Sequence, residues 1–344
     1  MVQPHEIAAM QRALEAARGA CVRPFPNPFV GCVLLDVRGD ELAVGVHRGA
    51  GTAHAEVDAL NRAGVRARGA TAVVTLEPCN HTGRTGPCAE ALIDAGVVRV
   101  VYAQSDPNPD ATGEAATLLA AGVDVEGGVL EAESQAMNAV WTHSITHGRP
   151  FVTWKYAATI DGRVAAPDGT SQWITGLEAR RDVQALRADA DAVMVGTGTV
   201  LADNPRLTLR DEHDAPLPYA RQPLRVVVGE TQLSNDLNVW SDDAPTLQIR
   251  SRSPSDVLRA LNAEEIRHVW LEGGPRLAGA FLDAGLIDRI IGYIAPSVLG
   301  AGKAAAEGRV RTLNDLHRFA FTDVRQIGAD VRVIAQPRTQ EGRV

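Results

Sequence analysis

The chain has 344 residues, 45% of them hydrophobic, and a formal net charge of −8. This length exceeds the size at which one hydrophobic core usually keeps growing, so two domains are expected. The acidic balance argues against a nucleic-acid-binding surface, which needs a basic stripe, and no apolar run is long enough to span a membrane.

The first part of the chain alternates predicted helices and strands. A helix is expected over residues 4–18, because Ile7, Met10 and Leu14 recur on one face. Strands are expected at 30–35, 42–46, 71–76, 97–103 and 123–126, and further helices at 54–63, 89–94 and 115–121. This alternation predicts a sheet that is covered by helices on both faces.

Four residues in this part form a pattern typical of a zinc-dependent deaminase: His54, Glu56, Cys79 and Cys88. One His and two Cys can hold Zn²⁺ and leave the fourth tetrahedral position to a water molecule, whose pKa the metal lowers towards about 7. Glu56 is not a ligand but is expected to shuttle the proton. Free cysteines are often ordinary core residues, but both thiols are expected at helix N-termini, where the dipole favours thiolate.

The two thiols are separated by an insertion, Asn80–Pro87, that a site serving only to hold metal does not need. We therefore expect this segment to contact the substrate. Cys21 and Cys32 are most simply core residues, because four cysteines at this length do not make a disulfide framework. Since the N-terminus also lacks the order of a signal peptide, a cytoplasmic protein with a small-molecule substrate is expected.

A domain boundary is predicted near His147–Pro150, which divides the chain into domains 1–147 and 148–344. The second domain again alternates helices and strands. Strands are expected at 151–158, 191–195, 224–228, 268–271, 288–294 and 330–335, and helices at 177–188, 254–262 and 275–284. Residues 211–222, rich in proline and charge, are expected to form a surface loop.

Two glycine motifs in the second domain follow predicted strands: Gly196–Thr199 and Gly273–Pro275. Each lets backbone N–H groups approach a phosphate, although each alone is more often a tight turn. Their position at strand ends in one domain favours a dinucleotide pocket. Arg187, Arg206 and Arg210 could belong to this pocket or be solvated surface charges.

The chain resembles a known family, the bacterial bifunctional riboflavin-biosynthesis deaminase–reductases, over nearly its whole length. The resemblance in the first domain rests on Pro26–Gly31, His54–Val57, Pro78–Thr85 with Cys88, and Asp106–Pro109. In the second it rests on Thr159–Gly162, Ser171–Gly176, Asp203–Thr208 and Glu272–Pro275. It implies an α/β protein with a cytidine-deaminase-like, three-layer first domain and a dihydrofolate-reductase-like second domain.

The resemblance also implies two consecutive reactions on small phosphorylated pyrimidines. In the first, zinc hydroxide deaminates 2,5-diamino-6-(5-phosphoribosylamino)pyrimidin-4-one at C2 to the aminouracil. In the second, NADPH reduces the ribosyl group of that product to ribityl. Zn²⁺ and NADPH are therefore the expected cofactors, a homo-oligomer is expected, and neither nucleic acid nor a membrane is an expected partner.

Residue roles follow from the matching motifs. His54, Cys79 and Cys88 match the zinc ligands and Glu56 the catalytic residue. Positions that match contacts to the first substrate are Asn27, His47, His81 and Arg84; those that match contacts to the second are Ser171, Arg187, Leu207, Arg210 and Glu272. Positions that match NADP contacts are Ala157, Trp173, Thr199, Asp203, Gly274, Pro275, Arg276, Leu277, Ala278, Gly279 and Ala280.

Within these roles, Arg84 is the expected phosphate partner of the first substrate, and Arg187 and Arg210 are expected on the phosphate of the second. Lys155, Asp203 and Glu272 are unranked candidates for the proton source in the reduction.

Three positions depart from the family pattern. Gly86 stands where the family usually has proline, and Glu114 replaces a commonly basic residue. Glu230 stands where a small hydroxyl residue often contacts NADP, and a carboxylate there would repel the 2′-phosphate. Three alternatives follow: an enzyme with only the deaminase half active, a non-catalytic zinc-binding regulatory protein, and an adenosine deaminase acting on nucleic acid. The intact Glu56 argues against the second and the acidic charge against the third.

Overall fold

The computed structural model describes residues 1–20, 24–80, 86–108 and 114–338. The chain forms two compact units, Met1–Gly148 and Arg149–Val344, and each is described by itself. Among the described residues, no helix is long and apolar enough to cross a membrane.

Unit 1 contains the expected strands and helices with small shifts in their ends, together with three helices for which no range was predicted: Gly64–Ala67, Glu131–Met137 and Ala139–His147. Its strands are β1 (Gly31–Leu35), β2 (Glu41–Val46), β3 (Thr71–Leu76), β4 (Arg99–Gln104) and β5 (Asp124–Glu126). Its helices are α1 (Pro4–Arg18), α2 (Ala55–Ala63), the 3₁₀ helix η1 (Gly64–Ala67), α3 (Cys88–Asp94), α4 (Glu114–Ala120), α5 (Glu131–Met137) and α6 (Ala139–His147).

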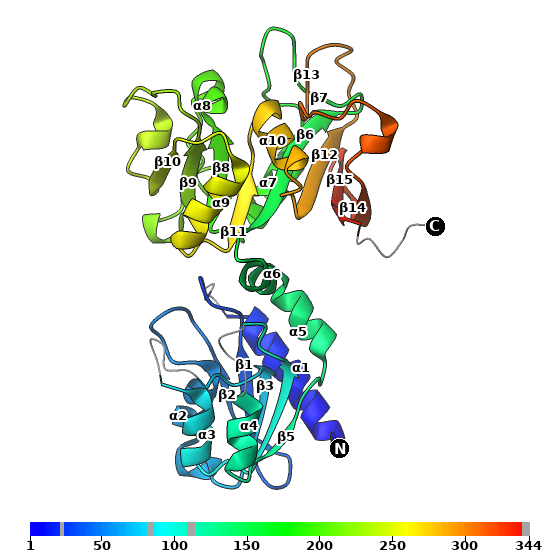
Figure 1. The fold of residues 1–344 in the computed structure, drawn as a ribbon. Coiled ribbons are helices and arrows are strands. Elements are labelled where there is room, and N and C mark those ends of the chain that lie inside the picture. The colour runs from blue at the N-terminus through cyan, green and yellow to red at the C-terminus, as the bar shows by residue number, and fades with distance from the viewer. Residues whose placement is uncertain (21–23, 81–85, 109–113, 339–344) are drawn as a thin grey trace. The chain divides into compact units, whose positions relative to one another are not determined.

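The sheet of unit 1 has the strand order β2-β1-β3-β4-β5, with β3, β4 and β5 parallel. Apolar side chains of α2, α3 and α4 pack on one face, whereas those of α1 and α5 pack on the other (Figure 1). The expected three-layer arrangement is thus confirmed. Because β3 and β4 run in parallel, the segments that follow them leave the same end of the sheet.

Unit 2 is built around a larger sheet. Its strands are β6 (Phe151–Thr159), β7 (Arg163–Ala165), β8 (Ala192–Gly196), β9 (Leu224–Val228), β10 (Thr246–Ile249), β11 (His268–Leu271), β12 (Arg289–Ala295), β13 (Lys303–Ala304), β14 (Phe319–Ile327) and β15 (Asp330–Pro337). Its helices are α7 (Leu177–Arg187), α8 (Thr197–Asp203), α9 (Pro254–Ala263) and α10 (Pro275–Asp283), with 3₁₀ turns η3 (Tyr219–Arg221), η4 (Asn238–Trp240) and η5 (Leu313–Asp315).

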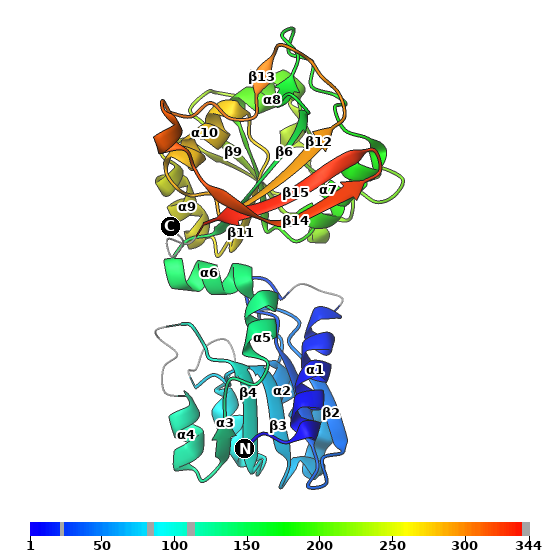
Figure 2. The ribbon, with the colours of Figure 1, turned by 90° about the vertical axis from the view of Figure 1, so that its right-hand side faces the viewer.

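The large sheet of unit 2 has the order β10-β9-β8-β11-β6-β12-β15-β14. Strands β10 to β12 in this order are parallel, and the antiparallel hairpin β14–β15 forms one edge (Figure 2). Apolar residues of α9 and α10 pack on one face and those of α7 and α8 on the other. The carboxyl ends of the parallel strands therefore open at one edge, where ligands bind in such sheets.

Several predictions about local structure in unit 2 were wrong or incomplete. Thr197 and Gly198 belong to the first turn of α8 and not to a glycine-rich turn, because Gly196 is already the N-cap. The strand β14 was missed because most of its residues are exposed and show no strict alternation of apolar and polar side chains. The loop 211–222 is present, with the 3₁₀ turn η3 near its end.

Candidate active sites

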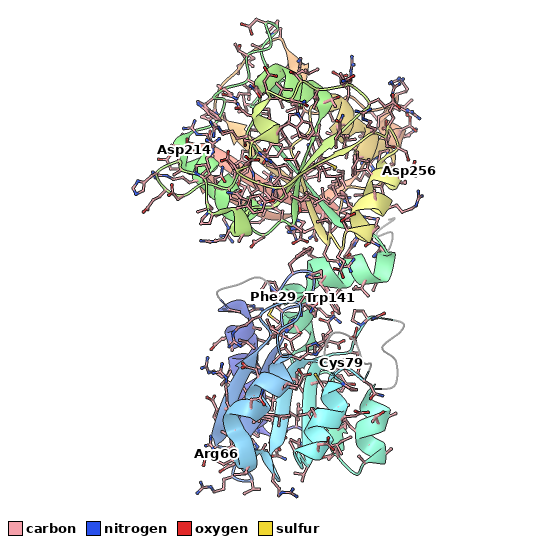
Figure 3. The ribbon with its side chains drawn as sticks, turned by 90° about the vertical axis from the view of Figure 1, so that its left-hand side faces the viewer. Phe29, Arg66, Cys79, Trp141, Asp214 and Asp256 are labelled. Atoms are coloured by element: carbon pink, nitrogen blue, oxygen red, sulfur yellow. The ribbon has the colours of Figure 1, made fainter. Side chains whose placement is uncertain are left out.

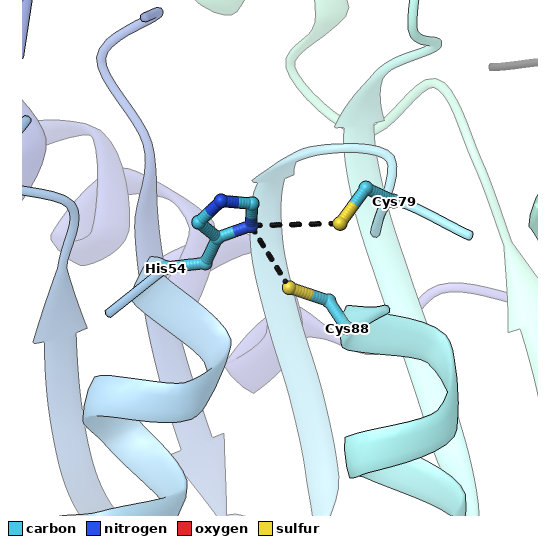
Figure 4. A group of neighbouring side chains, drawn as sticks. All are labelled: His54, Cys79 and Cys88. Carbon is cyan, nitrogen blue, oxygen red and sulfur yellow. Dashed lines mark hydrogen bonds between the residues drawn. The ribbon is translucent and has the colours of Figure 1, made fainter. Parts of the chain in front are cut away.

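Three side chains of unit 1 converge at the end of the sheet to which β3 runs: His54, Cys79 and Cys88 (Figure 4). His54 is the N-cap of α2, Cys79 lies three residues beyond β3, and Cys88 is the first residue of α3. Of the two cysteines, Cys88 stands at a helix N-terminus, whereas Cys79 follows a strand. Residues 81–85 lie outside the described residues, so the expected helix start at Cys79 stays a prediction. The Ala89 amide donates to the Cys79 carbonyl oxygen at 3.1 Å, which joins the two cysteine segments.

The spacing of the three ligand atoms fits zinc. His54 Nδ1 lies 3.2 Å from Cys88 Sγ and 3.5 Å from Cys79 Sγ, and all three atoms lie within 4.8 Å of one another. A tetrahedral zinc ion with Zn–N and Zn–S bonds of about 2.0–2.3 Å separates such atoms by about 3.6–3.8 Å. Two thiolates and an imidazole are also the donor set that zinc prefers, and they leave a fourth position open.

Glu56 is buried beside this cluster, two residues into the helix that His54 opens. Burial, together with the charge of Cys79, raises the pKa of Glu56 to about 7. A carboxyl group with a pKa near neutrality can both accept and return a proton, which suits a general acid–base. Hydrogen bonds from Cys88 and His54 lower the pKa of Cys79 to about 4, whereas the contact with Cys79 and burial raise the pKa of Cys88. Cys79 is therefore the sulfur of the pair that favours the thiolate form.

The helix α2 is held close to the sheet by two features of β2. A Cβ atom at Gly45 would lie 2.1 Å from the Ala55 carbonyl oxygen, so only glycine allows the first turn of α2 to approach. The Asp58 carboxylate accepts the Val46 backbone N–H at 3.0 Å. These contacts fix the turn that carries His54 and Glu56.

Asn27 and His47, both predicted to contact the first substrate, lie next to the zinc ligands. The His47 ring packs edge-on against His54 with centroids 5.2 Å apart. His47 Nδ1 lies 3.1 Å from the Ala53 carbonyl oxygen, which can only accept, so Nδ1 carries the proton. In neutral His47, whose pKa burial lowers, Nε2 is then an acceptor and takes a hydrogen bond from Asn27 Nδ2 at 2.9 Å. The Asn27 amide is thereby oriented with Oδ1 away from His47.

Two residues that support this site were not singled out from the sequence. Asn138 accepts from the Phe29 amide at 2.9 Å and donates to the Phe29 carbonyl oxygen at 3.0 Å, which anchors the segment after Asn27. Glu77 accepts backbone N–H groups of Asp106 and Ala115, which ties the turn after β4 to the start of α4. Phe29 and Cys79 lie towards one end of unit 1, with Arg66 at the other (Figure 3). No local sequence pattern marks the hydrogen bonds of Asn138 or Glu77, because their partners are remote in sequence.

His81 and Arg84, also predicted to contact the first substrate, lie outside the described residues. Gly86 and Pro87, which precede Cys88, are described, and Gly86 is exposed. The described part of the inter-thiol segment begins at Asn80, whose side-chain amide donates to Thr117 Oγ1 at 2.8 Å.

Unit 2 contains a cavity of about 1950 Å³ at the carboxyl ends of its parallel strands. All five residues predicted to contact the second substrate line it: Ser171, Arg187, Leu207, Arg210 and Glu272. Nine of the predicted NADP-contacting residues also line it: Ala157, Trp173, Thr199, Asp203, Gly274, Pro275, Arg276, Leu277 and Ala280. Ala278 and Gly279 do not, because they face the other side of α10, where Ala278 joins the core and Gly279 packs against Glu307.

The cavity fits a dinucleotide beside a phosphorylated pyrimidine. It is larger than the few hundred to about 1,000 Å³ typical of a site for one small molecule. Gly273 and Gly274 precede α10, whose N-terminus opens on the cavity. Such a helix start is favourable for a pyrophosphate group.

A charged cluster of Arg187, Glu272 and Lys155 lies on the cavity wall. Arg187 ends α7, Glu272 follows β11, and Lys155 lies in the middle of β6. The Arg187 guanidinium donates three hydrogen bonds to the Glu272 carboxylate, from Nη2 at 2.6 and 2.8 Å and from Nε at 2.9 Å, and Trp270 Nε1 also donates to Glu272. Burial opposes ionisation, but the charges of Arg187 and Lys155 hold the pKa of Glu272 at about 2. Desolvation lowers the pKa of Lys155, which lines the same cavity. Glu272 is thus a carboxylate at neutral pH, whereas Lys155 can give up a proton more readily than a solvated lysine.

Models of two protein families match the chain. The cytidine and deoxycytidylate deaminase zinc-binding region matches residues 4–104, and the RibD C-terminal domain matches residues 150–333. The two matched ranges fall in unit 1 and unit 2 respectively.

The chain is similar along most of its length to curated and solved proteins. It is 48% identical over 326 residues to the riboflavin biosynthesis protein RibD of Mycobacterium tuberculosis (strain ATCC 25618 / H37Rv), covering 94% of this chain and 95% of that one. It is 41% identical to the RibD protein of Escherichia coli (strain K12), covering 94% and 96%. The Acinetobacter baumannii RibD structure superposes with a TM-score of 0.89 at 36% identity, covering 97% and 99%. A diaminohydroxyphosphoribosylaminopyrimidine deaminase/5-amino-6-(5-phosphoribosylamino)uracil reductase from Thermotoga maritima gives 0.86 at 32%, covering 97% and 99%.

Proposed function

The chain belongs to the RibD family of riboflavin biosynthesis proteins, and from this premise we propose which of its residues carry the two reactions. It is a bifunctional enzyme with a zinc-binding deaminase domain and an NADPH-dependent reductase domain. The single observation that carries the assignment of the first site is the cluster of His54, Cys79 and Cys88 with Glu56 buried beside it.

We propose that the first site deaminates 2,5-diamino-6-(5-phosphoribosylamino)pyrimidin-4-one at C2. His54, Cys79 and Cys88 hold the zinc ion, which when bound supplies the Lewis acidity that activates water at neutral pH. Glu56 takes a proton from the attacking water and passes it to the ring nitrogen. Glu56 next takes the remaining proton from the oxygen that has bonded to C2 and gives it to the amino group. The C2–N bond then breaks, ammonia leaves and a C2=O bond forms. A pKa of about 7 at Glu56 supports both directions of transfer.

The orientation of the Asn27 amide supports a role in binding the pyrimidine. Because Nδ2 is engaged by His47, Asn27 offers its Oδ1 atom as an acceptor. An amino group or a ring N–H of a diaminopyrimidine is a suitable donor for it. His47 then acts through Asn27 as a positioning residue.

We propose that the second site reduces the ribosyl group of the deaminated product. NADPH, when bound, supplies the hydride to C1′. As the C1′–O4′ bond breaks, O4′ takes a proton, and Lys155 is the group on the cavity wall best suited to give it, because desolvation lowers its pKa. Glu272 is unsuited as the donor, since its pKa of about 2 leaves it ionised.

The contacts of the two arginines distinguish their roles at the second substrate. Arg187 is committed to Glu272 and also donates to the Thr208 carbonyl oxygen at 3.2 Å, so it orders the cavity wall. Arg210 pairs with the exposed Asp214 at 3.0 Å, a contact that a phosphate can replace at little cost. We therefore assign the substrate phosphate to Arg210.

Replacing one zinc ligand separates the two activities. We expect Cys79→Ala to lose its zinc ion and its ammonia release, because two protein ligands do not hold the metal firmly. NADPH oxidation with the deaminated substrate should continue at its usual rate, since the second cavity is lined by unit 2 residues. Zinc content is measured by mass spectrometry and the two activities in parallel assays.

The matched control is Cys32→Ala. Cys32 is a buried cysteine of β1 whose sulfur lies outside the ligand cluster, so this variant should keep its zinc and release ammonia. Full zinc occupancy and full ammonia release in Cys79→Ala would refute the assigned metal site. The expected homo-oligomer and cytoplasmic location stay predictions; sedimentation and fractionation would test them.

A further inference from the structure

An ion pair stands at the carboxyl ends of two neighbouring parallel strands in unit 2. The Arg252 Nη2 atom lies 2.9 Å from Glu230 Oε2. Strands β9 and β10 pair in parallel, and the Gly229 amide donates to the Ile249 carbonyl oxygen at 3.0 Å. The segments that carry Glu230 and Arg252 therefore leave the sheet side by side.

This pair borders the end of the cavity that is remote from the charged cluster. Arg252 lines the cavity, as do Gly229 and Thr231 on either side of Glu230. In the sheet order β10-β9-β8-β11-β6, the charged cluster belongs to β11 and β6, and β10 lies three strand intervals from β11, about 14 Å away. In the proposed reductase, a nicotinamide at the charged cluster and a pyrophosphate at the start of α10 would place the adenosine half at β9 and β10.

The two side chains have opposite preferences for the 2′ position of adenosine, where NADPH and NADH differ. A carboxylate at a strand end accepts a hydrogen bond from a 2′-hydroxyl, whereas a guanidinium beside it binds a 2′-phosphate. Arg252 and Glu230 have side chains that are 84% and 56% exposed, so their mutual attraction is weak enough to be exchanged for a ligand contact. Nearby, Ser251 Oγ accepts the Ser253 amide and Ser253 Oγ accepts the Asp256 amide, and each hydroxyl keeps its own O–H as a donor.

We propose that Glu230 and Arg252 together contact the 2′ position of the coenzyme and determine how strongly the reductase site prefers NADPH over NADH. When NADPH binds, Arg252 breaks its ion pair with Glu230 and binds the 2′-phosphate instead. The Glu230 carboxylate stays nearby, and its repulsion of the phosphate offsets part of the binding energy that Arg252 contributes. With NADH, Glu230 accepts the 2′-hydroxyl while Arg252 keeps its ion pair. The protein therefore prefers NADPH over NADH by a smaller factor than it would if Arg252 acted without Glu230. This inference rests on the proposed reductase function and names the residues that select its coenzyme.

The test is the affinity of the full-length protein for NADPH and NADH, measured by calorimetry together with the fragments 2′,5′-ADP and 5′-AMP. Loss of a charge-assisted contact in Arg252→Ala should weaken NADPH and 2′,5′-ADP about 10- to 100-fold and change NADH and 5′-AMP less than about twofold. Glu230→Ser should bind NADPH several-fold more tightly and NADH more weakly, because the repulsion and the acceptor are both removed. Arg250→Ala is the matched control, since Arg250 is an exposed arginine of the same segment outside the described cavity lining, and it should match the wild type.

The outcomes separate this inference from the reductase function. If Arg252→Ala lowers the affinity for NADPH and NADH equally, or changes neither affinity, the pair does not select the coenzyme. The reductase function still stands in that case, provided that the wild-type protein binds NADPH. An unchanged NADPH to NADH ratio in Glu230→Ser would remove Glu230 from the selection. If the wild type binds neither coenzyme, the reductase function and the inference both fail.

Discussion

Glu56→Gln is expected to keep its zinc ion and to release ammonia about 10²- to 10⁴-fold more slowly, which is the usual contribution of a positioned general acid–base. Glutamine has nearly the same shape as glutamate, so the buried site should keep its packing, but it cannot take a proton from water or return one to ammonia. The substitution leaves the three zinc ligands unchanged, because Glu56 is not one of the metal-binding residues. Metal content and ammonia release on the same preparation measure both effects.

The control for this variant is Glu90→Gln, an exposed glutamate in the first turn of α3, the helix that Cys88 opens. It removes one carboxylate near the site without removing the proton carrier, so its ammonia release should stay close to wild type. If Glu56→Gln releases ammonia at a wild-type rate with zinc bound, Glu56 is not the proton shuttle.

Lys155→Met is expected to slow NADPH oxidation with the deaminated substrate about 10²- to 10⁴-fold, again the range for one positioned proton donor. Methionine keeps the apolar stem of lysine in β6 and removes only its ammonium group. The affinity for NADPH should change little, because the effect is on proton transfer to the sugar oxygen. Stopped-flow absorbance of NADPH gives the rate, and calorimetry gives the affinity.

Lys303→Met provides the comparison, because Lys303 is the chain's other lysine and also lines the cavity but is exposed. It should retain most of the NADPH oxidation. Ammonia release from the first substrate should be unchanged in both variants. If Lys155→Met oxidises NADPH at the wild-type rate, Lys155 is not the proton donor, and another group on the cavity wall must supply the proton.

The zinc site could be predicted from the sequence because its parts are local signals. His54 and Cys88 each open a helix, and Cys79 follows a buried apolar strand, so the chemistry of each position can be read without its partners. The helix over residues 4–18 and the strands 224–228 and 268–271 have the predicted bounds, because one face of the helix and most of the strand residues are apolar and buried. Ile7, expected on the apolar face of the helix, is 40% exposed.

What could not be predicted depends on contacts between distant residues. Arg187 and Glu272 are 85 positions apart, and only the fold brings them together, so Arg187 was expected to face a phosphate and not a carboxylate. Glu230 raised a doubt about NADPH, but the sequence could not reveal that Arg252 stands beside it. The strand β10 was missed because none of its residues is fully buried, which leaves no apolar run to mark it.

The most direct test follows both products in one reaction of the wild-type enzyme with zinc, NADPH and the diaminopyrimidine substrate. One ammonia should be released per substrate, and NADPH absorbance should then fall by an equal amount after a lag that ammonia release defines. Supplying the deaminated substrate should abolish the lag. Ammonia release without any substrate-dependent loss of NADPH, or NADPH oxidation that precedes ammonia release, would contradict the two consecutive reactions.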